Sequence, residues 1–137
     1  MKFNPLIPVY GDTNYRGKSP FEDTEHINFV SWVRFNYPEY GAVLIHPKNE
    51  GKKSFSQVAK DKKMGLKKGA SDIIIPASPS FVCEIKRVNH VKDSHWEKGQ
   101  QEYLLAAKSA GSFVCVALGA EGAKLAFLDW HKLISGL

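Results

Sequence analysis

The sequence predicts one α/β domain in which a mixed central β-sheet is flanked by helices. The chain of 137 residues is long enough for a single buried core, and 43% of its residues are hydrophobic. Helical and strand-like segments alternate along it, and no internal repeat or linker divides it. Apolar runs are short, and none approaches the roughly 20 residues that cross a bilayer, so no membrane association is expected.

The domain is predicted to begin after an irregular N-terminal arm, which spans residues 1–18 and is broken by prolines and glycines. Residues 19–137 then form a single domain. Its first helix has an N-cap serine at Ser19, a proline at the next position and a glutamate, Glu22, three residues after the cap. Apolar residues at helical spacing carry this helix to about Asn36.

The remaining elements follow from short apolar runs and two further helical patterns. The apolar runs fit strands because they are brief and are bounded by glycine, proline or serine. A second serine-to-glutamate capping pattern begins the last helix, which ends before a glycine. We expect a strand over 42–46, a polar helix over 54–64, strands over 71–75 and 81–86, a helix over 94–110, and strands over 112–118 and 124–128.

The two cysteines, Cys83 and Cys115, both lie inside apolar runs. A disulfide scaffold would contain more cysteines, and two alone cannot complete the usual four-ligand zinc site. Both are therefore predicted to be reduced core residues. The N-terminus lacks a continuous apolar signal segment, so we expect a cytoplasmic protein, in a bacterial cell or in a host cell if the source is viral.

The charge distribution favours a polyanionic partner. The net charge is +5 and the pI is about 9.2. Eight lysines lie between Lys48 and Lys68, against only Glu50 and Asp61. A solvated lysine-rich loop and helix is the simpler alternative. The candidate nucleic-acid-binding residues are Lys48, Asn49, Lys52, Lys53, Lys62, Lys63, Lys67 and Lys68.

Two carboxylates and a lysine interrupt the apolar strand pair. If the two strands pair symmetrically about Ser78, Asp72 faces Glu84 with their Cβ atoms about 5 Å apart. Lys86 projects from the same face as Glu84. Facing carboxylates are costly to bury unless a cation lies between them, and Mg²⁺ is commonly held by carboxylates, waters and phosphate oxygens. The pattern alone leaves an exposed edge-strand salt bridge from Lys86 as an equal alternative.

These residues belong to an ordered series of motifs that runs from about Ser19 to Leu128. The series contains an early helix glutamate, H-P-K-N-E-G at 46–51, K-K-M-G followed by a second glycine before the aspartate, E-I-K at 84–86 and a glutamine on the last helix. It resembles the virus-type replication-repair nuclease (VRR-NUC) domain of the PD-(D/E)xK nuclease superfamily. Three positions depart from the family pattern: Ser71 replaces a proline, Lys48 is inserted in the "PN" step and His26 replaces a glutamine.

The resemblance implies a restriction-endonuclease-like core and a Mg²⁺-dependent deoxyribonuclease in which Mn²⁺ substitutes for Mg²⁺. Asp72 and Glu84 would bind the metal, and Lys86 would orient or activate the hydrolytic water. The chemistry agrees with this assignment, because a bound divalent cation can generate a nucleophile near neutral pH and relieve charge on the phosphoryl oxygens.

Two further residues are assigned with the help of the resemblance. Glu22 is the favoured helix-borne metal ligand, although its position after Ser19 also suits a capping role, and Glu25 competes with it. Gln100 is the favoured active-site glutamine, because it shares a helix face with residues expected to pack on the sheet, whereas Gln101 points about a third of a turn away.

The leading functional hypothesis is a DNA endonuclease acting in replication, repair or recombination, with branched or Holliday-junction DNA among its candidate substrates. One active site cuts one strand at a time, so symmetric junction cleavage would require a homodimer. The alternative is a non-catalytic nucleic-acid-binding module that keeps the nuclease fold. The presence of all the acidic, lysine and glutamine positions argues against that alternative and against a purely structural scaffold.

Overall fold

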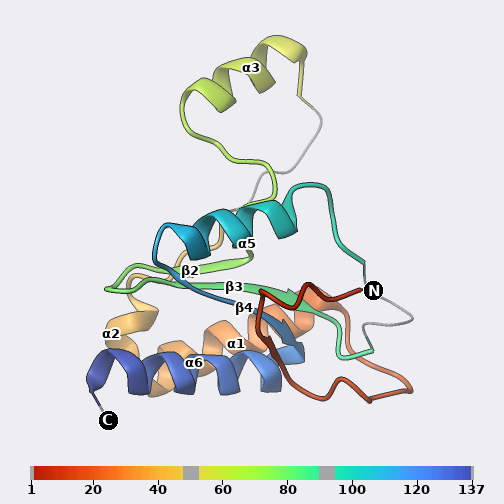
Figure 1. Ribbon diagram of the computed structural model, residues 1–137, viewed down its shortest axis with the longest axis vertical. Helices are drawn as coiled ribbons and strands as arrows, with labels where there is room; N and C mark the ends of the chain where they lie inside the picture. The colour runs from red at the N-terminus through yellow and green to blue at the C-terminus, as the bar shows by residue number, and fades with distance from the viewer. Residues whose placement is uncertain (1, 48–52, 90–94, 137) are drawn as a thin grey trace.

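The computed structural model describes residues 2–47, 53–89 and 95–136. At its centre is a mixed four-stranded sheet with the strand order β1–β4–β3–β2 (Figure 1). Strands β1 and β3 run parallel to β4, and β2 runs antiparallel to β3. The predicted mixed central sheet is therefore confirmed. The strands are β1 (Val9–Tyr10), β2 (Ile73–Ile75), β3 (Phe81–Lys86) and β4 (Phe113–Leu118).

Helices cover both faces of the sheet. One face packs against α1 (Glu22–Asn36), α2 (Pro38–Gly41) and α6 (Gly119–Ser135), and the other against α5 (Gln100–Ser109) (Figure 1). Helix α3 (Phe55–Lys63) stands apart from the sheet. None of the helices in the described residues combines the length and apolarity that a bilayer crossing needs.

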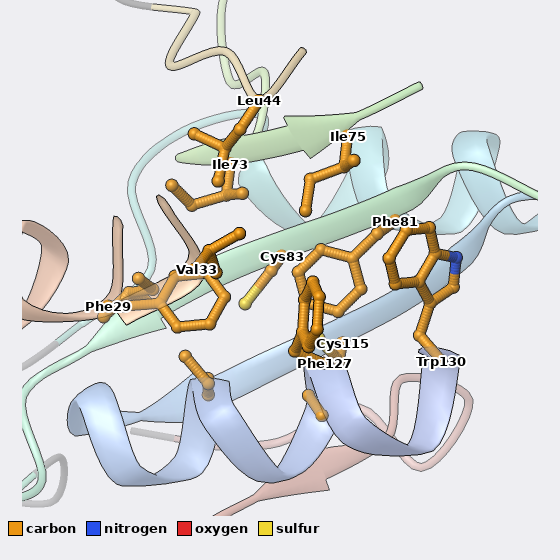
Figure 2. Close-up of a cluster of buried hydrophobic side chains, with 14 of the residues drawn as sticks. Phe29, Val33, Leu44, Ile73, Ile75, Phe81, Cys83, Cys115, Phe127 and Trp130 are labelled. Atoms are coloured by element: carbon orange, nitrogen blue, oxygen red, sulfur yellow. The ribbon is translucent and has the colours of Figure 1, made fainter. Parts of the chain in front are cut away.

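The larger core lies between the sheet and the helices α1 and α6. Side chains of Phe29, Phe81, Phe127 and Trp130 meet there, each with no exposed surface (Figure 2). Burying one such side chain contributes about 1.5–3 kcal/mol. A smaller core on the opposite face includes Leu104 of α5. Because successive strand residues alternate between faces, odd-numbered residues of β3 enter the larger core and even-numbered ones face α5.

The strand pairing follows the predicted register. Ile73 pairs with Cys83 and Ile75 pairs with Phe81, which places the centre of the hairpin at Ser78. Cys83 also lies opposite Cys115 across the β3–β4 pair, and both cysteines are buried and free, as predicted. Extended by one pair, this register sets Asp72, the residue before β2, opposite Glu84 on β3.

The predicted C-terminal strand over 124–128 is wrong, because these residues lie inside α6. Ala123, Phe127 and Trp130 are buried at spacings of four and three residues, whereas Leu125 is 54% exposed. A helix places residues at these spacings on one face. Alanine, which is frequent here, also has the highest helix propensity.

Several predicted boundaries also need correction. Helix α1 begins at Glu22, and its N-cap residue is Phe21, which has no polar side chain to cap it; the Ser19 hydroxyl accepts a hydrogen bond from Arg87 Nε (3.3 Å). The segment 42–46 contributes only an isolated bridge, between Ile45 and Ile74, rather than a strand. The N-terminal arm contains the short strand β1, so it is not wholly irregular.

The helix predicted over 94–110 also begins at a different residue. Helix α5 begins at Gln100, after Gly99 in the left-handed conformation (φ 92°), and not near residue 94. Ser94, the predicted cap, lies outside the described residues. By contrast, α3 begins as expected, with the Ser54 hydroxyl accepting from the Gln57 N–H at 3.2 Å.

Candidate active site

A cleft of about 430 Å³ opens between the N-terminus of α1, the end of β3 and the start of α5. It contains every side chain that the sequence analysis assigned to the catalytic and metal sites. Glu84 and Lys86 reach it from β3, Asp72 from the residue before β2, and Gln100 from the first turn of α5. The lining residues are Phe21, Glu22, Asp23, Asp72, Glu84, Lys86, Arg87, His95, Glu97 and Gln100.

The Gln100 side-chain amide links the other polar groups. Its Nε2 donates to Glu84 Oε1 at 2.9 Å, and its Oε1 accepts from Lys86 Nζ at 3.0 Å. The same oxygen accepts from the backbone N–H of Glu97 at 2.8 Å, which fixes the amide at the start of α5. Gln100 therefore binds both ionisable side chains of β3, Glu84 and Lys86, and fixes their positions.

Glu84 is a buried carboxyl whose pKa is raised by its surroundings. It is 1% exposed, and its Oε2 has no hydrogen-bond partner among the described residues. Burial raises the pKa of Glu84 well above its ordinary value, and the Asp72 carboxyl raises it further, while Lys86 opposes the shift. A buried carboxylate with an unpaired oxygen beside a second carboxylate fits a divalent cation, which would supply the missing positive charge.

Asp72 lies against the same stretch of β3. Its Oδ2 accepts from the backbone N–H of Ile85 at 2.9 Å, which places the carboxylate between the positions of Glu84 and Lys86. The alternative of an exposed edge-strand salt bridge is wrong, because β3 is an inner strand and Lys86 is only 2% exposed. Lys86 Nζ instead donates to the His95 carbonyl at 2.7 Å as well as to the glutamine.

The two candidate acids of α1 point to different places. Glu22 lines the cleft, and its charge is close enough to raise the pKa of Glu84. Glu25 is buried against the start of α6, where a Cβ atom added to Gly119 would meet its Oε2. Burial raises the pKa of Glu25, and a hydrogen bond from the Ala120 backbone partly offsets that effect. Of these two glutamates, Glu22 lines the cleft and Glu25 does not.

The lysines assigned to nucleic-acid binding lie on α3 and its flanking segments, which we call the α3 arm (residues 53–69). Lys53 pairs with Asp61 at 2.6 Å. Four more are exposed: Lys62, Lys63, Lys67 and Lys68. Lys48, Asn49 and Lys52 lie outside the described residues.

The α3 arm returns to the domain beside the cleft. Gly69 and Gly99 pack so closely that a Cβ atom added to Gly69 would lie 2.4 Å from the Gly99 carbonyl carbon. Both glycines have positive φ values, 85° and 92°. Because Gly99 precedes Gln100, the base of the arm contacts the helix start that carries the glutamine.

Arg87 is a cleft residue that the sequence analysis did not single out. Its NH2 group donates to the Ser19 carbonyl at 2.8 Å, and its guanidinium lies 5.0 Å from the centroid of the Phe21 ring. The sequence could have indicated Arg87 as a cleft residue, because it directly follows Lys86 at the end of the strand that carries the candidate site. Arg87 thus ties the entry of α1 to the end of β3.

Comparison with known proteins supports the fold. No family model matches the chain, and no curated protein matches it. A solved structure described as "VRR_NUC domain protein" is similar with a TM-score of 0.65 and 21% sequence identity, over 85% of this chain and 93% of that chain. This chain therefore has the fold of a VRR-NUC domain, as its ordered sequence motifs indicated.

Proposed function

We propose that this protein is a metal-dependent DNA nuclease that hydrolyses phosphodiester bonds in the cleft around Asp72, Glu84 and Lys86. The observation that carries the proposal is the buried Glu84 carboxylate, held by Gln100 beside Asp72 with one oxygen unpaired among the described residues. The fold shared with a protein described as a VRR_NUC domain protein supports the same activity.

Asp72 and Glu84, with Glu22 from α1, are the residues that would hold Mg²⁺ or Mn²⁺. Such an ion supplies Lewis acidity toward the phosphoryl oxygens and lowers the pKa of water. Glu84 is suited to this role because its protein neighbours leave it short of positive charge. Gln100 keeps the Glu84 carboxylate oriented, since its amide donates to one oxygen, while the other has no hydrogen-bond partner among the described residues.

Lys86 is positioned to act on the attacking water or on the phosphate. A lysine ammonium has three N–H donors. Two of them are directed at Gln100 Oε1 and the His95 carbonyl, and the third has no acceptor among the described residues. Both of these hydrogen-bond acceptors are neutral, so the ammonium keeps its charge beside Glu84, where it can also stabilise a developing oxyanion.

The α3 arm is suited to hold the DNA backbone near this cleft. Its exposed lysines can neutralise phosphates, and its base packs against the start of α5 beside Gln100. Phosphate contacts of this kind position DNA without reading its sequence. We therefore propose that substrate choice depends on DNA structure, with branched DNA as the first class to examine.

A nicking assay tests the proposal. Supercoiled plasmid and a panel of linear, nicked, flapped and four-way DNA are incubated with the protein and Mg²⁺ or Mn²⁺, with EDTA as the control. Cleavage should require the metal and should disappear in Glu84→Gln but persist in Glu39→Gln, a matched change at an exposed glutamate on α2. DNA binding with no metal-dependent cleavage of any substrate would instead identify a non-catalytic binding module.

A further inference from the structure

A second group of potential metal ligands lies beside the catalytic carboxylates. His26 of α1, His46 from the segment after α2, and Asp72 each present a ligand atom within 4.8 Å of the other two. We propose that these three residues bind a transition-metal ion, with Zn²⁺ as the best-suited species. This metal-binding activity goes beyond the proposed nuclease and does not depend on it.

The hydrogen bond of His46 fixes the form of its ring. Its Nδ1 lies 2.6 Å from the backbone oxygen of Asp72, and a carbonyl oxygen can only accept, so Nδ1 carries a proton. In the neutral ring, Nε2 then has the free lone pair that a metal needs. Metal-bound histidines commonly donate their other ring N–H to a backbone carbonyl in this way, which orients the ring.

The two imidazole rings lie edge to face, with centroids 4.3 Å apart and an interplanar angle of 70°. They border a cavity of about 390 Å³ that also contains Asp72 and the α1 acids Glu22 and Asp23. His46 is exposed and His26 is half-buried, so a metal can enter from solvent without a change in the core. Water can complete the coordination in the remaining space.

The donor set selects the class of metal. Two imidazole nitrogens and one carboxylate suit Zn²⁺ and related transition metals, whereas Mg²⁺ favours oxygen ligands. The histidine site therefore differs in preference from the Glu22, Asp72 and Glu84 set. The two sets share Asp72, which lines both cavities, so they are neighbours.

Metal titration of the full chain tests this proposal. The protein is freed of metal, and Zn²⁺ binding is followed by calorimetry and Co²⁺ binding by its visible absorption. His26→Gln and His46→Gln should each weaken Zn²⁺ binding by at least about 100-fold and remove the Co²⁺ spectrum. His131→Gln is the matched control, since His131 on α6 borders neither cavity.

Glu84→Gln separates the two metal sites. It should retain Zn²⁺ binding and lose Mg²⁺ binding, whereas the two histidine variants should lose Zn²⁺ and retain Mg²⁺. The inference is overturned if the wild-type chain does not bind Zn²⁺, if both histidine variants bind it as the parent does, or if Glu84→Gln alone removes it. Thermal unfolding of each variant checks the fold, and exposed His46 provides a substitution that leaves the core intact.

Failure of this inference is distinct from failure of the proposed nuclease. Zinc binding is read without DNA, and DNA cleavage is read with Mg²⁺ in the absence of Zn²⁺. A chain that binds Zn²⁺ through the histidines but cuts no DNA would retain the metal site and exclude the nuclease. A chain that cuts DNA but binds no Zn²⁺ would retain the proposed nuclease and exclude the histidine metal site.

Discussion

Replacing Glu84 by glutamine should stabilise the metal-free protein while abolishing DNA cleavage. In the parent chain, Glu84 Oε2 is buried without a partner among the described residues, and the Asp72 carboxyl lies close enough to raise its pKa. The substituted amide keeps an oxygen for the hydrogen bond from Gln100. Its nitrogen then offers a donor beside Asp72, where two acids met before.

The size of this effect follows from the exchange of one interaction for another. A hydrogen bond from the new amide to the Asp72 carboxylate contributes about 1.5–3 kcal/mol, and removing a titratable carboxyl whose pKa is raised by burial acts in the same direction. We expect a gain of about 2 kcal/mol in the free energy of unfolding. For a domain of 137 residues, 1 kcal/mol corresponds to roughly 3–4 °C, so the melting temperature should rise by about 7 °C.

Added Mg²⁺ should reverse the order of stabilities. At a concentration 100 times its dissociation constant, a ligand stabilises the folded state by about 2.7 kcal/mol, and only the parent chain should receive this gain. Thermal unfolding followed by circular dichroism, with EDTA and then with Mg²⁺, measures both effects. Glu39→Gln should change stability by no more than about 0.5 kcal/mol in either condition. A Glu84→Gln variant that melts below the parent without metal, or gains equally from Mg²⁺, would refute the reasoning.

Three further predictions concern other residues. Lys86→Ala should lose nicking activity but keep its Mn²⁺ affinity by calorimetry, because a protonated amine offers the metal no lone pair; turnover near the parent rate would contradict this. Replacing Lys62 and Lys63 together by alanine should reduce the slope of log affinity against log salt by about 1.8, measured by fluorescence anisotropy, and an unchanged slope would place the DNA on another surface. Burial raises the pKa of Glu25 above its ordinary value of 4.5, so the folded state holds a proton that the unfolded state has released, and stability falls as pH rises from 4.5 through the raised pKa. Glu25→Gln should therefore flatten this decline in unfolding experiments at pH values above 4.5, and a variant with the parent's pH dependence would argue against it.

The sequence predicted the β2–β3 hairpin because the evidence for it is local. Two apolar runs flank a segment rich in proline and serine, and the spacing about Ser78 alone set the register. The same register placed Asp72 near Glu84. Helix α6 was missed because Leu125 to Leu128 form a short apolar run, which does not distinguish a strand from a buried helical segment.

Tertiary contacts decided what the sequence left open. Glu22 and Glu25 lie one turn apart on α1, and only the packing of α6 shows that Glu25 is turned away from the cleft. Ser19 had the pattern of a helix cap, but Arg87, 68 residues later, binds it instead. The histidine site was not predicted, since His26, His46 and Asp72 are far apart in sequence and no spacing rule connects them.

The position of the α3 arm also makes it a place where the chain can be cut into two fragments. The arm lies between Ile45 and Ile74 in the sequence, and these two residues are bridged to each other beside the sheet. A protease cut in the exposed helix α3 would yield two pieces that remain packed together. Glu22, His26 and His46 would belong to one piece, and Asp72, Glu84, Lys86 and Gln100 to the other. The protein is thus a natural candidate for fragment complementation, in which neither half holds a complete site and mixing the halves restores it.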